Sequence, residues 1–204
     1  MKNEKIPSHF VSLQENGFAC KNYYTGEGGI RIGITTEFIK SIGFVDDTIW
    51  IHPRILPKLT AVKDKLYSEG FGLIIKDGFR PVELITEVCR LREEAGLPVK
   101  KLMSQKKMPH ATGMAVDAML ADISKDSNDY EIVGKELITR NQRRDGLSSC
   151  FVDFYNGMSN PECVNYQNLQ NILVRTFLRE GFVLGNRREY WHFELPLLFK
   201  EKRY

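Results

Sequence analysis

The sequence predicts an α+β protein with a mainly antiparallel sheet and flanking helices. Two observations support this expectation: helix-like and strand-like segments are mixed along the chain, and the last two predicted strands are close neighbours in sequence. A chain of 204 residues is long enough for one large domain or two small ones with a real hydrophobic core. Because no repeat or low-complexity linker divides residues 1–204, we expect a single domain.

Three segments carry apolar residues at helical spacing. The first covers 54–69 and is suited to end at Gly70, and its inward residues are Leu56, Leu59, Val62 and Leu66. The second is expected to have Pro81 as its first residue, where the missing N–H costs nothing, and to end near Gly96 and Pro98. Its expected inward residues are Val82, Ile85, Val88 and Leu91. The third covers 165–180 and ends at Gly181, with an inward face of Leu169, Ile172, Leu173 and Phe177.

Short apolar runs predict the strands. They cover 72–76 and 116–120, and the segments 182–184 and 190–195 are expected to pair as a hairpin around Gly185 and Asn186. Asp77 and Gly78 are expected to form a turn. The glycines near the start of the chain predict a turn or loop; they are Gly26, Gly28 and Gly29.

Charge and composition narrow the classes of partner. The net charge is only +3 and the basic residues are scattered, which argues against nucleic acid. The densest basic cluster, within 100–107, is expected to be a solvated loop. The chain has no apolar run long enough for a membrane span and its first residues do not resemble a secretory signal. We therefore expect a cytoplasmic protein with no membrane partner, and the sequence leaves its oligomeric state open.

The four cysteines form no C-x-x-C pair, so a cysteine zinc knuckle is not indicated. Cys89 falls inside a predicted helix and is expected to be a small core residue. Cys150 and Cys163 are open to two interpretations, a disulfide or free thiols, and the expected reducing compartment favours free thiols.

Two of the four histidines lie in unusual local settings, the segments His110–Asp117 (HATGMAVD) and Glu189–His192 (EYWH). Catalytic zinc needs three protein ligands and a fourth position for water, and two imidazoles with one carboxylate meet that need. The metal lowers the pKa of its water, and a carboxylate that is not a ligand must take the proton. These residue types point to one zinc ion held at the sheet by His110, Asp117 and His192, with Glu189 as the general base.

The spacing adds a geometric condition. On a regular strand, Glu189 and His192 would point to opposite faces, so Glu189 must precede the strand or lie at a bend. His110 and Asp117 are seven apart, and Gly113 offers the turn that they need. A single histidine is more often a hydrogen-bonded structural residue than a ligand, so each residue taken by itself favours the structural interpretation.

Taken together, the motifs resemble those of a known family. The segments DGFRP (77–81), HATGMAVD (110–117) and EYWHF (189–193) occur in order and resemble the three signature blocks of the D-alanyl-D-alanine dipeptidases, zinc peptidases known from vancomycin resistance. The broader group includes D,D-carboxypeptidases and some phage endolysins. NYYTG (22–26) also resembles a stretch of the dipeptidase branch, so the resemblance spans about 18–195 and is thin between the blocks.

The resemblance implies a role for each matching residue. His110, Asp117 and His192 match the zinc ligands, and Glu189 matches the catalytic base. Arg80 matches the arginine that stabilises the carbonyl oxygen as it becomes an oxyanion, although a structural salt bridge at the helix start is the alternative.

Three further residues concern the substrate. Asp153 matches weakly the acidic residue that holds the substrate amino group. Two positions depart from the family pattern: Met108 stands where a serine is common, and Phe18 aligns with a tyrosine. Both departures remove a hydroxyl, which puts the identity of the peptide substrate in question.

The expected function is therefore hydrolysis of the dipeptide D-alanyl-D-alanine by a zinc enzyme acting on a small peptide. The alternative is a D,D-carboxypeptidase or another dipeptidase acting on peptidoglycan peptides. A non-catalytic protein that keeps the fold and the zinc for binding is a third interpretation. The presence of all three ligands and the base argues against it.

Overall fold

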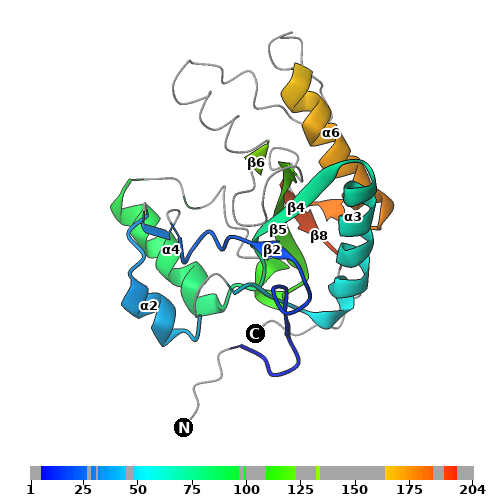
Figure 1. Cartoon of the computed structure of the whole chain (residues 1–204). Helices are drawn as coiled ribbons and strands as arrows, with labels where there is room; N and C mark the ends of the chain where they lie inside the picture. The colour runs from blue at the N-terminus through cyan, green and yellow to red at the C-terminus, as the bar shows by residue number, and fades with distance from the viewer. Residues whose placement is uncertain are drawn as a thin grey trace. The chain divides into compact units, whose positions relative to one another are not determined.

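The computed structural model describes the chain in several separate ranges (Figure 1). The described residues are 6–26, 29–30, 32–44, 48–96, 99, 109–122, 132–133, 164–185 and 191–196. Helices and strands alternate through these ranges, so the mixed α/β character predicted from the sequence is confirmed. In the described residues, no helix is both long and apolar enough to cross a membrane.

The chain divides by its internal contacts into two compact units. The first unit consists of Met1–Ile55, Ile75–Val116 and Leu197–Tyr204, and the second of Leu56–Ile74 and Asp117–Pro196. The expectation of a single domain stays a prediction.

The strands form a small and a larger sheet. In the small sheet β1 (Val11–Ser12) pairs with β3 (Trp50–Ile51). The larger sheet has the order β2-β4-β5-β8-β7, with β6 (Ile132–Val133) paired to β5. Its other members are β2 (Ala19–Cys20), β4 (Phe71–Asp77), β5 (Ala115–Asp122), β7 (Val183–Leu184) and β8 (His192–Glu194). The pairs β1–β3, β5–β6 and β7–β8 are antiparallel. The expectation of a mainly antiparallel sheet stays a prediction.

The first unit has an aromatic-rich core beneath two helices, α2 (Thr36–Ser41) and α4 (Val82–Glu94). The side chain of Thr35 caps α2 by accepting a hydrogen bond from the N–H of Phe38 at 3.2 Å, which satisfies one of the N–H groups exposed at a helix start. Burial of apolar surface is the main force that holds these elements. The core residues are Phe10, Tyr24, Ile34, Ile39, Ile42, Phe44, Phe79, Leu84 and Val88.

The start of α4 corrects two expectations. Pro81 is the N-cap residue rather than the first helical residue, because its ψ of 152° is extended and its carbonyl accepts from the N–H of Leu84. The inward face also differs from the prediction. Val82 is exposed, and Leu84 joins Ile85 and Val88 in the buried stripe. Cys89, expected in the core, is only half-buried.

The second unit is built on two helices that pack together, α3 (Leu56–Ser68) and α6 (Val164–Arg179) (Figure 1, cyan and orange). A short 3-10 helix, η1 (Pro53–Ile55), precedes α3. Both helices match the predicted segments, and both end at glycines with positive φ, Gly70 at 87° and Gly181 at 86°. The inward faces are confirmed in their central residues, although Leu56, Leu169 and Ile172 are only half-buried.

The predicted C-terminal hairpin is confirmed as the β7–β8 pair, with Val183 opposite Glu194 and Leu184 opposite Phe193. The ring of Phe193 stacks on that of Phe177 from α6, with centroids 3.7 Å apart and planes 8° apart. This contact fixes β8 against α6 and so fixes the strand that begins with His192. Gly185 is described, whereas Asn186 lies outside the described residues.

Candidate metal centre

His110 lies in a tight turn of the first unit. The turn is a 3-10 helix, η2 (Pro109–Thr112), in which the hydroxyl of Thr112 donates to the carbonyl of Pro109 at 2.7 Å. Gly113 follows with φ of 67°, which favours glycine because a Cβ is disfavoured there. The turn expected at Gly113 is therefore confirmed, and it connects His110 to β5.

The DGFRP segment fixes the His110 ring. The Nδ1 of His110 lies 2.6 Å from the carbonyl oxygen of Gly78, and the N–H of Arg80 donates to the carbonyl of His110 at 3.0 Å. A carbonyl only accepts, so Nδ1 carries a proton, and in the neutral ring this leaves the lone pair for a metal on Nε2. Two motifs 32 positions apart in sequence thus combine to orient the ring of His110.

Asp117 and His192 come together in the second unit. Asp117 lies within β5 and His192 begins β8, and the N–H of Ala118 donates to the carbonyl of Trp191 at 2.8 Å. The Nδ1 of His192 is 2.9 Å from Oδ1 of Asp117. The backbone contact between the strands therefore aligns the two side chains.

His192 is held between two carboxylates. Its Nε2 lies 3.0 Å from Oε1 of Glu194, while its Nδ1 faces Asp117. Burial alone would lower the pKa of His192, but hydrogen bonds to Asp117 and Glu194 outweigh burial and raise the pKa to about 9. Without a metal, the side chain is therefore an imidazolium that donates from both nitrogens.

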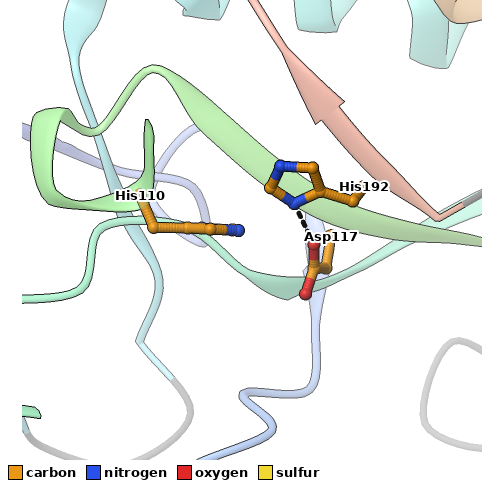
Figure 2. A group of neighbouring side chains, drawn as sticks. All are labelled: His110, Asp117 and His192. Carbon is orange, nitrogen blue, oxygen red and sulfur yellow. Dashed lines mark hydrogen bonds and ion pairs between the residues drawn. The ribbon is translucent and has the colours of Figure 1, made fainter. Parts of the chain in front are cut away.

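The ligand atoms of His110, Asp117 and His192 all lie within 4.8 Å of one another. Figure 2 shows the ring of His110 pointing toward the other two side chains. Both histidines are buried, 3% and 8% exposed, and Asp117 is half-buried. This group could hold a metal ion, because two imidazole nitrogens and a carboxylate oxygen are the donors that divalent transition metals accept.

Arg80 is firmly oriented. Its Nε donates to Oδ2 of Asp77 at 2.5 Å, a second guanidinium nitrogen pairs with the same oxygen, and the guanidinium lies over the ring of Tyr24, 5.1 Å from the centroid. Asp77, expected in a turn, ends β4, and its Oδ1 accepts from the N–H of Gly78. The salt bridge expected as the structural interpretation of Arg80 is present. The role in catalysis stays a prediction.

Four other residues were predicted to take part in catalysis or substrate binding. Glu189, Asp153 and Met108 lie outside the described residues. Phe18 is buried, and its N–H donates to the carbonyl of Leu13 at 3.0 Å. Its proposed place near the substrate stays a prediction. Cys150 and Cys163 also lie outside the described residues, so their pairing stays open.

Sequence reasoning assigned no role to two carboxylates near this site. Asp77, quoted as part of a turn and of the DGFRP block, holds Arg80. Glu194, within a predicted strand, contacts His192. The strand prediction contained the signal for Glu194, because residues two apart on a strand share a face and Glu194 follows His192 by two. The signal for Asp77 was weaker, since its partner Arg80 lies three residues away across the end of a strand.

No protein-family model matches the chain, and no curated protein matches it.

Proposed function

We propose that the chain is a zinc-dependent peptidase that hydrolyses the dipeptide D-alanyl-D-alanine to free D-alanine. The observation that carries the proposal is the gathering of the ligand atoms of His110, Asp117 and His192 within 4.8 Å of one another. Two histidines and one carboxylate are a common ligand set for catalytic zinc. The choice of substrate is supported by the resemblance of the three sequence blocks to the D-alanyl-D-alanine dipeptidases.

The donor set fits zinc on two counts. His110 already presents Nε2, because its Nδ1 is committed to the carbonyl of Gly78. His192 and Asp117 face each other at 2.9 Å through a proton that a divalent ion would replace. Three protein ligands leave one position for water or substrate, as catalysis requires.

Residues of the protein carry out the chemical steps that zinc does not. When bound, zinc supplies a Lewis acid that polarises the peptide carbonyl and lowers the pKa of water toward neutrality. Glu189 takes the proton from the attacking water and delivers it to the leaving amine. Arg80 donates hydrogen bonds to the carbonyl oxygen as negative charge develops there. Asp77 holds the guanidinium in place, so its orientation costs nothing during the reaction.

A specific observation in the sequence favours a second candidate function. Phe18 and Met108 replace two hydroxyl-bearing residues of the dipeptidases, and loss of a polar contact relaxes the selection of a free amino group. A D,D-carboxypeptidase, or another dipeptidase acting on peptidoglycan peptides, would fit those changes. The two functions differ in the length of peptide that they accept.

The experiment compares two substrates for the purified zinc-loaded protein. Release of D-alanine is measured from D-Ala-D-Ala and from a longer, N-blocked peptide that ends in D-Ala-D-Ala, with chelator-treated protein as the blank. We expect chelator-sensitive release from the dipeptide and none from the blocked peptide. Release from the blocked peptide would favour the carboxypeptidase. A zinc-bound protein that cleaves neither substrate would contradict both functions.

A further inference from the structure

Glu194 lies on the side of the His192 ring away from Asp117. The geometry points to Glu194 as a positioning residue that holds His192 with Nδ1 turned toward the metal and Nε2 turned away. This inference rests on the proposed function, because it takes His192 as a metal ligand. Glu194 itself is not part of the ligand group.

The first support is the division of the ring's two nitrogens. Nδ1 faces Oδ1 of Asp117 at 2.9 Å, and Nε2 faces Oε1 of Glu194 at 3.0 Å. The two nitrogens of an imidazole point in divergent directions, so an ion shared with Asp117 binds through Nδ1. A carboxylate accepts only, so Glu194 keeps a proton on Nε2 and leaves the lone pair on Nδ1 for the metal.

The second support is the position of Glu194 on β8. His192 and Glu194 are two residues apart on one strand, so both side chains leave the same face. Both are largely buried, at 10% and 19% side-chain exposure. Water therefore competes weakly for this hydrogen bond, and the strand backbone fixes both partners without a flexible loop between them.

The third support is Gly185, which directly follows β7. A Cβ built on Gly185 would lie 1.9 Å from Oε1 of Glu194 and 2.6 Å from Cδ2 of His192. The Gly185 backbone therefore packs directly against the hydrogen-bonded pair, and any larger residue would push into it. Because β7 pairs with β8 through Val183 and Glu194, the hairpin itself brings Gly185 to this position.

Outer partners of this kind set both the tautomer and the orientation of a ligating histidine. Their loss typically weakens metal binding or activity about 10- to 100-fold. We expect Glu194→Leu to weaken zinc affinity by about this factor. Glu194→Gln retains an oxygen that accepts from Nε2 and should keep most of the affinity.

The test measures zinc affinity by competition with a chromophoric chelator for the unsubstituted protein, Glu194→Leu, Glu194→Gln and Gly185→Ala. Glu93→Leu is the matched control, because Glu93 is an exposed carboxylate on α4. Gly185→Ala keeps the carboxylate but displaces it, so it tests the same contact by another route. The visible spectrum of the cobalt-substituted protein reports whether the ligand geometry changes, and circular dichroism reports whether each variant folds.

The expected result is weaker zinc binding and an altered cobalt spectrum for Glu194→Leu and Gly185→Ala, with near-normal values for Glu194→Gln and Glu93→Leu. If the unsubstituted protein binds zinc and folded Glu194→Leu and Gly185→Ala bind it equally well, the positioning role is wrong. If the unsubstituted protein binds no zinc, the proposed function itself is wrong. The two failures are thus distinguishable.

Discussion

Replacing Gly113 by alanine tests how the turn that carries His110 is built. Gly113 has φ of 67°, and a Cβ there would lie 2.5 Å from Cε2 of Phe10 and 2.8 Å from the N of His52. The carbonyl of Gly113 also accepts a hydrogen bond from the N–H of His52 at 3.0 Å. The new methyl group would therefore meet a buried ring and a backbone that is already engaged.

The magnitude follows from two separate costs. A left-handed backbone costs an L-residue about 1–2 kcal/mol relative to glycine. Forcing a methyl group into a packed region costs about 1–3 kcal/mol more. We expect Gly113→Ala to lower the free energy of unfolding by about 2–5 kcal/mol, which is a large share of the stability of an ordinary domain.

Gly96 provides a matched control for the cost of the left-handed backbone alone. Its φ is 66°, and nothing lies within 4 Å of a Cβ built there. Gly96→Ala should therefore cost about 1–2 kcal/mol. Urea denaturation of the three proteins gives both differences as shifts of the unfolding midpoint, provided the slopes agree. Equal costs for the two variants would mean that Gly113 does not pack against Phe10 and His52, and would refute the reasoning.

Three other predictions concern the site. Asp77→Asn should lower kcat about 10- to 100-fold, because Arg80 loses its alignment, and should leave zinc affinity unchanged. Steady-state kinetics and zinc competition measure the two quantities. An unchanged kcat would argue that the ion pair of Asp77 and Arg80 is only structural. Zinc uptake at pH 7 should release a proton from His192, whose pKa is about 9 without metal, so apparent affinity rises with pH and levels off above about 9. Calorimetry in buffers of different ionisation enthalpy measures the release, and its absence would contradict the assigned charge. Glu189→Ala should abolish turnover and keep zinc bound, and retained activity would remove Glu189 from the mechanism.

Helical periodicity predicted much of the fold. The segments of α3 and α6 were recognised because apolar residues recur along one face and glycines follow each helix. The start of α4 was misplaced by one residue. A proline with extended ψ can cap a helix as well as open it.

The ligand residues of the candidate site were easier to predict from the sequence than the contacts that orient them. His110, Asp117 and His192 stood out through their local segments, and the structure gathers them. The contacts that orient them did not stand out. The Gly78 carbonyl reaches His110 across 32 positions, and a backbone oxygen has no signature in the sequence. Such contacts depend on how strands and turns pack, which local patterns do not specify.

The central claim, a single zinc ion that supports hydrolysis of D-alanyl-D-alanine, is tested most directly by titration. Metal-free protein is titrated with zinc while release of D-alanine is followed, with zinc content measured at each point. We expect no release without zinc, a rise with each addition, and a plateau at one zinc per chain. Release that is independent of zinc, or a fully zinc-loaded protein that releases none, would contradict the account.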